Sequence, residues 1–181
     1  LSCTTGGALA TVRWSNQFEI YLTALGADDR LQPARPITAD AYDDSPALWM
    51  PDGRALLFNT NRNGASDIFS LDVDTGVATP LATGPLNEVA KALSPDGRWL
   101  FYAVRAEAEV VASASSWTLM RMELAGGAPK EMLKLDPDDG IRCGTGPGSR
   151  CVLAESAGEA PHHRLHGQGV FPQAVALIVA R

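Results

Sequence analysis

Residues 43–83, DDSPALWMPDGRALLFNTNRNGASDIFSLDVDTGVATPLAT, decide the fold, because they read as four short strands joined by turns. The beginning of this stretch returns further along the chain, where residues 92–101 (ALSPDGRWLF) align with residues 48–58 (LWMPDGRALLF). The repeat places Gly53 and Gly97 44 residues apart. A regular interval of this length indicates stacked units of one supersecondary structure.

A tight turn occupies the same place in both copies. Pro51 presets φ for the first corner, Asp52 can hydrogen-bond its own backbone, and Gly53 tolerates the positive φ that reverses the chain. The second copy of the turn consists of Pro95, Asp96 and Gly97. We therefore predict a left-handed conformation at both glycines, between the first two strands of each unit.

The strands that follow these turns are apolar without alternation, at residues 55–58 and 99–104. Such strands are buried on both faces. The rest of the first unit is a turn at 61–64, a third strand at 67–73, the pair Thr75-Gly76 and an outer strand at 77–81. Four strands per unit and a repeat of about 40–50 residues together predict a β-propeller blade.

The same residues carry a family resemblance. Residues 45–54 (SPALWMPDGR), Phe58, residues 61–64 (NRNG) and residues 67–69 (DIF) resemble the WD-like repeat of bacterial TolB-like β-propeller proteins. The resemblance covers residues 43 to about 135. It departs from the family at Met50, where a Ser is usual, and in a longer loop after Tyr102. It implies the fold and, by itself, no activity.

We predict an all-β chain of blades with four antiparallel strands in an incomplete ring, a fragment of a longer propeller. The propeller fragment is expected at residues 1–155, with blades at about 1–39, 40–83, 84–135 and a partial blade at 136–155. Blade one is expected to begin part-way, because no inner strand or Pro-Asp-Gly turn precedes residues 8–14. Residues 156–181 form a divergent tail. This tail either contributes one strand at 174–180 or is not a natural continuation of the chain.

Composition excludes several partner classes. The net charge of −6 and the absence of a basic patch argue against nucleic-acid binding. No apolar run reaches the length of a membrane span, so direct membrane insertion is not expected. Because the chain begins with Leu1, we expect an excerpt or a processed product, whose partners include the remaining blades of the parent chain.

Two cysteines, Cys143 and Cys151, lie on strands expected to flank one turn. They either pair as a disulfide, which suits an oxidising compartment, or remain two buried thiols. The expected location is accordingly periplasmic or extracytoplasmic, with the cytoplasm as the alternative.

Other residues suggest chemistry weakly. Among His162, His163 and His166, the first and last would lie on one face of a helix, as two zinc ligands require. Pro161 and the nearby glycines favour a loop instead. The glycine-rich residues 144–148 (GTGPG) are expected to form a turn and not a phosphate-binding loop. Residues 136–140 are expected to form a solvated loop and not a weak calcium site. No Gly-x-Ser-x-Gly elbow is present. We expect no catalysis, no metal and no cofactor.

We expect a non-catalytic binding or interaction module, as the sensor or scaffold part of a bacterial envelope or signalling protein. The alternative is the N-terminal gating propeller of a prolyl-oligopeptidase-type serine peptidase that lacks its catalytic domain. Neither activity follows from the repeat itself.

Alternating strand directions bring the blade-to-blade loops and the loops between second and third strands to one face. The expected binding residues there are Tyr42, Asp43, Asp44, Arg62, Asn63, Asn87, Glu88 and Arg105, together with Glu107 and Glu109. A protein or peptide partner is expected to dock on this face, with Tyr42 and Arg62 central. Alanine at these two positions should weaken binding and leave melting unchanged. The alternative is an ordinary solvated loop face.

Overall fold

The structure, a computed structural model, describes residues 2–3, 8–14, 17–105, 117–136, 139–144, 149–154 and 175–178. Every regular element in these ranges is a β-strand. No helix among them is long and apolar enough to cross a membrane. All strand pairs are antiparallel and form four separate sheets, which we call blades 1 to 4.

Each blade is built from consecutive strands. Blade 1 contains β1 (Ser2–Cys3), β2 (Ala8–Trp14), β3 (Phe18–Ala24) and β4 (Arg35–Pro36). Blade 2 contains β5 (Asp44–Trp49), β6 (Ala55–Asn63), β7 (Ala65–Asp72) and β8 (Ala78–Ala82). Blade 3 contains β9 (Asn87–Leu93), β10 (Trp99–Arg105), β11 (Trp117–Glu123) and β12 (Lys130–Leu135). Blade 4 contains β13 (Gly140–Cys143), β14 (Cys151–Ala154) and β15 (Val175–Ile178).

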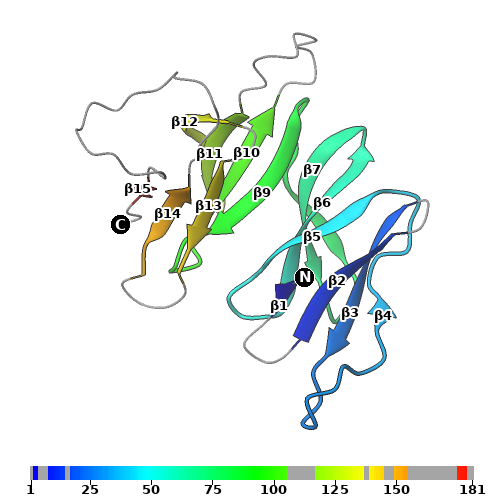
Figure 1. Cartoon of the computed structure of the whole chain (residues 1–181). Helices are drawn as coiled ribbons and strands as arrows, with labels where there is room; N and C mark the ends of the chain where they lie inside the picture. The colour runs from blue at the N-terminus through cyan, green and yellow to red at the C-terminus, as the bar shows by residue number, and fades with distance from the viewer. Residues whose placement is uncertain are drawn as a thin grey trace.

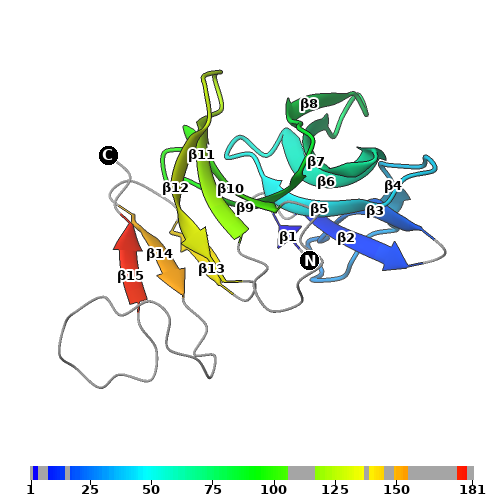
Figure 2. The ribbon, with the colours of Figure 1, turned by 90° about the horizontal axis from the view of Figure 1, so that it is seen from above.

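The blades follow one another along an arc in sequence order (Figure 1). Seen from above, the first strands β1, β5, β9 and β13 converge toward one side, while β4 and β8 lie at the periphery (Figure 2). This is the arrangement of propeller blades around an axis. The described strands do not close into a ring, so the expected all-β, incomplete ring of four-stranded blades is confirmed.

Two details differ from or extend the sequence analysis. Blade 1 does possess an inner strand, because Ser2 and Cys3 pair with Ala10 and Leu9 of β2, although no inner strand was expected. A two-residue strand is too short to leave a periodic signal. In the C-terminal part, β15 adds to β14 as the third strand of blade 4.

The two repeated turns adopt the expected conformation, with φ of 69° at Gly53 and 68° at Gly97. The amide of Gly53 donates to the Met50 carbonyl at 2.9 Å, and the amide of Gly97 donates to the Ser94 carbonyl at 2.8 Å. The carboxylate of Asp96 also accepts from the Ser94 hydroxyl and from the Arg98 amide. The left-handed glycines are therefore confirmed as the reversals between first and second strands.

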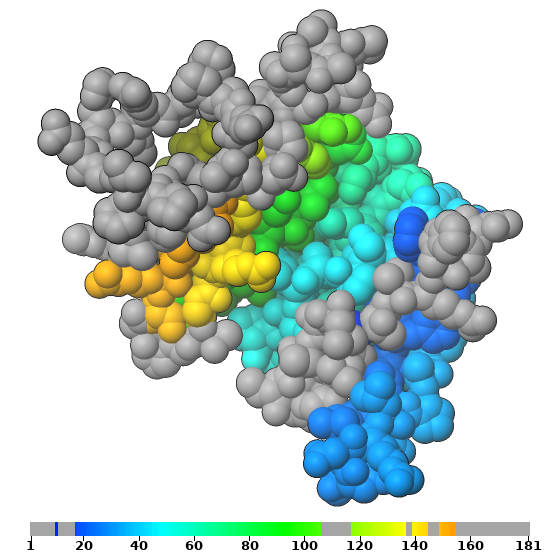
Figure 3. Space-filling model, in the orientation of Figure 1, coloured from blue at the N-terminus to red at the C-terminus, as the bar shows by residue number. Residues whose placement is uncertain are grey.

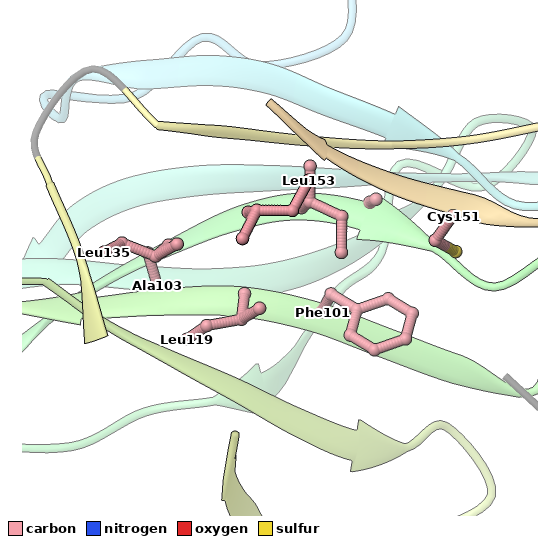
Figure 4. Packing of buried hydrophobic residues seen from close by; sticks show 8 residues of the cluster. Phe101, Ala103, Leu119, Leu135, Cys151 and Leu153 are labelled. Carbon is pink, nitrogen blue, oxygen red and sulfur yellow. The ribbon is translucent and has the colours of Figure 1, made fainter. Parts of the chain in front are cut away.

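Apolar side chains pack between neighbouring blades rather than within one sheet. Three clusters of buried residues fill the three seams. Between blades 1 and 2 they are Ala10, Ile20, Leu56, Phe58, Phe69, Leu71 and Val73. Between blades 2 and 3 they are Leu57, Ile68, Ala82, Leu100, Tyr102 and Met122. Between blades 3 and 4 they are Ala92, Phe101, Ala103, Leu119, Leu135, Ile141, Cys151 and Leu153, most of which Figure 4 labels. The space-filling view shows the blades in contact in chain order, from blue to orange (Figure 3).

Cys143 and Cys151 form a disulfide, so the paired interpretation is the correct one of the two alternatives. The two residues face each other across the β13–β14 ladder. The disulfide closes a short hairpin whose Cys151 side chain also belongs to the core between blades 3 and 4. It thereby crosslinks the first two strands of the partial blade that packs on blade 3.

The turn at Gly97 offers a test of contact between blades. A Cβ at this position would lie 2.5 Å from Cγ of Pro51, in the equivalent turn of blade 2. We expect Gly97→Ala to destabilise the protein by more than the roughly 1–2 kcal/mol of left-handed strain alone. Urea unfolding of the variant measures this difference.

Gly76 is the matched control, because its φ is 73° and no atom lies within 4 Å of its virtual Cβ. Gly76→Ala therefore reports strain without the contact. A Pro51→Ala substitution in the Gly97→Ala background should recover the excess cost. Equal costs for the two glycine substitutions would contradict the contact between the turns.

Candidate functional site

The connections between second and third strands emerge at the same end as the connections between blades. Figure 1 shows this end at the top of blade 3, where β9 begins and β10 ends. We call the described part of it the rim, which comprises residues 17–18, 37–44, 61–67, 83–88 and Arg105. Loops at the end of a rigid scaffold are free of packing constraints and are common binding surfaces. All the expected binding residues that the structure describes lie in the rim.

Arg62 is the most connected of them. Its guanidinium stacks on three rings, with Cζ at 4.8 Å from the centroid of Phe69, 5.4 Å from Phe58 and 5.7 Å from Tyr42. Its Nη2 lies 3.2 Å from Asp40 and 3.5 Å from Asp44, and its Nε donates to the Thr60 hydroxyl at 3.1 Å. A planar guanidinium suits this combination of stacking and ion pairing. Arg62 therefore joins the rim to the apolar core of the seam between blades 1 and 2.

Asp44 belongs to the interior rather than to the exposed surface. Its side chain is 1% exposed, and neither carboxylate oxygen accepts a hydrogen bond of normal geometry. Burial raises the pKa of Asp44 above its ordinary value, while Arg62 and the hydroxyls of Thr60 and Thr38 oppose this rise. The sequence analysis placed Asp44 on the binding face because it lies in the connection between blades 1 and 2. A docked partner does not reach it in this conformation.

Tyr42 and Asp43 do reach the surface. The Tyr42 side chain is 41% exposed, and that of Phe18 in blade 1 is 39% exposed. Asp43 holds these two segments together, because its Oδ1 accepts the Phe18 amide at 3.1 Å and its Oδ2 accepts Asn61 Nδ2 at 3.2 Å. The Asp43 amide in turn donates to Asn61 Oδ1 at 2.9 Å. We call Phe18, Tyr42, Asp43 and Asn61 the rim patch.

Three further expected residues gather at a second place, between blades 2 and 3. Asn63 Nδ2 donates to Asp67 Oδ2 at 2.6 Å. Asn87 Oδ1 accepts the Ser66 amide at 2.9 Å. Glu88 is only 9% exposed, and burial together with the nearby Asp67 carboxylate raises its pKa to about 7. The Asn87 side chain connects the two blades, whereas the Asn63 side chain bonds within blade 2 and the Glu88 side chain is buried in the seam.

Arg105 lies apart from both groups. Its guanidinium is 5.3 Å from the ring centroid of Trp117, which Lys91 also approaches at 5.4 Å. Glu107 and Glu109 fall outside the described residues, as do His162, His163 and His166. Within the described ranges no group of three or more His, Cys, Asp or Glu side chains is arranged to hold a metal ion.

The structure thus divides the expected site into an exposed patch and two sets of structural contacts. Sequence reasoning missed Phe18, Asp40, Asn61 and Asp67. Phe18 lies in blade 1, whose repeat pattern is weak. Asp67 belongs to the repeat itself, which the sequence analysis used as a signal of the fold and not of a site. The pairing of Asn61 with Asp43 depends on spatial neighbours 18 residues apart, which no local pattern indicates.

The burial of Asp44 changes the expectation for Arg62. Arg62→Ala should destabilise the protein by about 2–3 kcal/mol, because the buried carboxylate loses its cation. Tyr42→Ala removes only one of three rings and should cost less than about 1 kcal/mol. Urea unfolding of the two variants provides the comparison.

Asp44→Asn in the Arg62→Ala background should recover part of the loss, since a neutral amide needs no counter-charge. Arg62→Lys keeps the charge but not the planar stacking, and should fall between wild type and alanine. Should Arg62→Ala unfold at the wild-type midpoint, the ion pair would contribute nothing to stability.

No protein-family model matches the chain. An uncharacterized protein of Agrobacterium fabrum (strain C58 / ATCC 33970) is 39% identical over 54 residues, which represent 30% of this chain and 18% of that protein. Among solved structures, TolB from Acinetobacter baumannii gives a TM-score of 0.61 at 19% identity, over 82% of this chain and 37% of TolB.

The structure of putative TolB from Agrobacterium tumefaciens gives a TM-score of 0.61 at 21% identity, over 86% of this chain and 53% of that one. An oligogalacturonate lyase in complex with manganese gives a TM-score of 0.61 at 18% identity, over 89% of this chain and 46% of the lyase. The chain thus spans 37% to 53% of the length of these three structures. The fold that the repeat indicated is confirmed: the chain has the β-propeller fold of these structures.

Proposed function

We propose that this chain is part of a non-catalytic β-propeller module that binds a protein or peptide partner at the rim patch. The observation that carries the proposal is the pair of exposed aromatic side chains, Phe18 and Tyr42, at the mouth of the seam between blades 1 and 2. Aromatic residues are enriched at the energetic centres of protein interfaces.

The patch is preorganised for binding. Asp43 and Asn61 exchange two hydrogen bonds, and Asp43 also accepts the Phe18 amide, so the backbone beneath both rings is fixed. The Tyr42 ring lies on the Arg62 guanidinium, which itself packs on the core. A surface held in this way loses little conformational entropy when a partner binds.

Charge indicates the partner's chemistry. Asp40 and Asp43 stand beside the two rings, and Arg62, the cation among them, is already paired with Asp40 and Asp44. The chain as a whole carries a net charge of −6. The partner that fits is an extended peptide segment with apolar side chains and Lys or Arg next to them, because its cations would approach the exposed Asp43 carboxylate, which forms no salt bridge with a described cation.

The cellular setting follows from the disulfide and the fold. Disulfides persist in oxidising compartments, which supports a periplasmic or extracytoplasmic location. The resemblance to TolB-like repeats supports a sensor or scaffold role in a bacterial envelope or signalling protein. The remaining blades of a longer ring would pack on the outer faces of this fragment and protect its strand edges.

Peptide display against the immobilised protein tests the binding proposal. Selected peptides should combine aromatic or aliphatic residues with Lys or Arg. Their affinity, measured by fluorescence anisotropy, should fall about tenfold or more for Phe18→Ala and Tyr42→Ala, while both variants remain folded at the assay temperature. Raising the ionic strength should also weaken binding.

Val77→Ala is the matched control, since Val77 is 57% exposed in the turn between β7 and β8, at the opposite end of blade 2. It should leave affinity unchanged. Equal affinity in all three variants, or selected peptides without cationic residues, would contradict binding at the rim patch.

The proposed location has its own test. In protein isolated from cells with thiols blocked at lysis, Cys143 and Cys151 should resist alkylation until a reductant is added. Mass spectrometry of the peptides that contain them reads this out. Alkylation of both cysteines without reductant would indicate a reducing compartment.

A further inference from the structure

Two buried carboxyl groups meet at the seam between blades 2 and 3. Asp67 begins the buried part of β7 and is 0% exposed, and Glu88 is the second residue of β9 and is 9% exposed. The backbones beside them are joined, because the Ser66 hydroxyl donates to the Glu88 carbonyl at 3.3 Å. The seam therefore holds both carboxyl groups at the edge of the apolar core.

Each carboxyl group has one oxygen without a partner. Asp67 Oδ2 accepts from Asn63, but Oδ1 accepts no hydrogen bond. Glu88 Oε2 is likewise buried without a partner. A Cβ on Gly84 would lie 2.7 Å from Glu88 Oε1, so the absence of a side chain at Gly84 makes room for this carboxyl group. An ionised carboxylate with an unpaired buried oxygen is costly.

The surrounding charges do not compensate the pair. Asp67 from β7 and Tyr102 from β10 are the titratable groups that face Glu88. The charged groups on the other strands that pack against β9 are engaged elsewhere or face solvent. Asp44 of β5 and Arg62 of β6 pair with each other, Lys91 and Arg105 stack on Trp117, and Arg142 of β13 is exposed.

We propose that Glu88 holds a proton beside the Asp67 carboxyl group, and that loss of this proton loosens the contact between blades 2 and 3. With the proton in place, a carboxylic acid and a carboxylate lie together and the seam carries one negative charge. Without it, two like charges face each other in a poorly solvated space. The pair is thus a pH-sensitive joint between blades.

The direction of the pH effect follows from the linkage of protonation to opening. Burial, first, and then the Asp67 charge raise the pKa of Glu88 from 4.5 to about 7 in the closed seam. In an opened seam the group returns toward its ordinary pKa. The closed form therefore binds more protons between pH 4.5 and 7, so opening increases as the pH rises through this window and levels off above it. Burial and the charge of Glu88 also raise the pKa of Tyr102.

Two backbone amides report on the seam. The Ser66 amide donates to Asn87 Oδ1 at 2.9 Å, and the Ala90 amide donates to Asn59 Oδ1 at 3.2 Å, so both bonds cross from one blade to the other. Opening of the seam exposes these amides to exchange with solvent.

The experiment is hydrogen exchange with mass-spectrometric detection on the full chain from pH 5 to 8, with rates divided by the intrinsic rate at each pH. In the wild type, protection of peptides that contain Ser66 and Ala90 should fall about 10- to 100-fold between pH 5 and 7 and then remain constant. Glu88→Gln should abolish this change. Asp67→Asn should reduce it, because the repelling charge is gone.

Glu123→Gln is the matched control, an acidic residue on the neighbouring strand β11 that pairs with Arg98 at the surface. It should keep the wild-type profile. Unchanged protection in the wild type, or the same profile in Glu88→Gln, would overturn the proposal. So would recovery of protection at pH 7.5 on addition of calcium chloride, which would identify a cation site in place of a proton on Glu88.

Discussion

Packing between blades is the interaction on which the rest of the structure depends. Leu57 and Phe58 are adjacent on β6, yet Leu57 faces blade 3 and Phe58 faces blade 1. Because both faces of the central strands are apolar, no blade can bury its core alone. The unbroken apolar runs in the sequence and the arc of blades have this single physical cause.

Apolar packing also decides where polar groups gather. Toward the rim the seams end in buried acidic side chains, with Asp44 at the first seam and Asp67 and Glu88 at the second. The two seams solve the resulting charge problem differently. At the first, Arg62 supplies a cation and stacks on the core rings. At the second, no described cation forms a salt bridge with either carboxyl group, which leaves a proton as the simplest compensation.

The sequence predicts the fold well and the site only in part. Pro-Asp-Gly turns, apolar strands and the 44-residue interval are local signals, and the structure follows them at Gly53 and Gly97. Burial of Asp44 and the contacts of Arg62 depend on which strands become neighbours and on a register irregularity between Thr60 and Asn63. Such features arise from tertiary packing, so they leave no pattern within one strand.

A single hairpin connects the two seams. In the order Asn61, Arg62, Asn63, three successive side chains donate to or pair with Asp43, Asp44 and Asp67, which lie on two different segments. Gly64, at φ of 101°, completes the turn and its amide donates to the Asn61 carbonyl at 2.9 Å. Asn61 supports the rim patch, whereas Asn63 holds the Asp67 carboxyl group beside Glu88. Any displacement of this hairpin when the second seam loosens must therefore also shift the support of Phe18 and Tyr42, because the same few residues hold both.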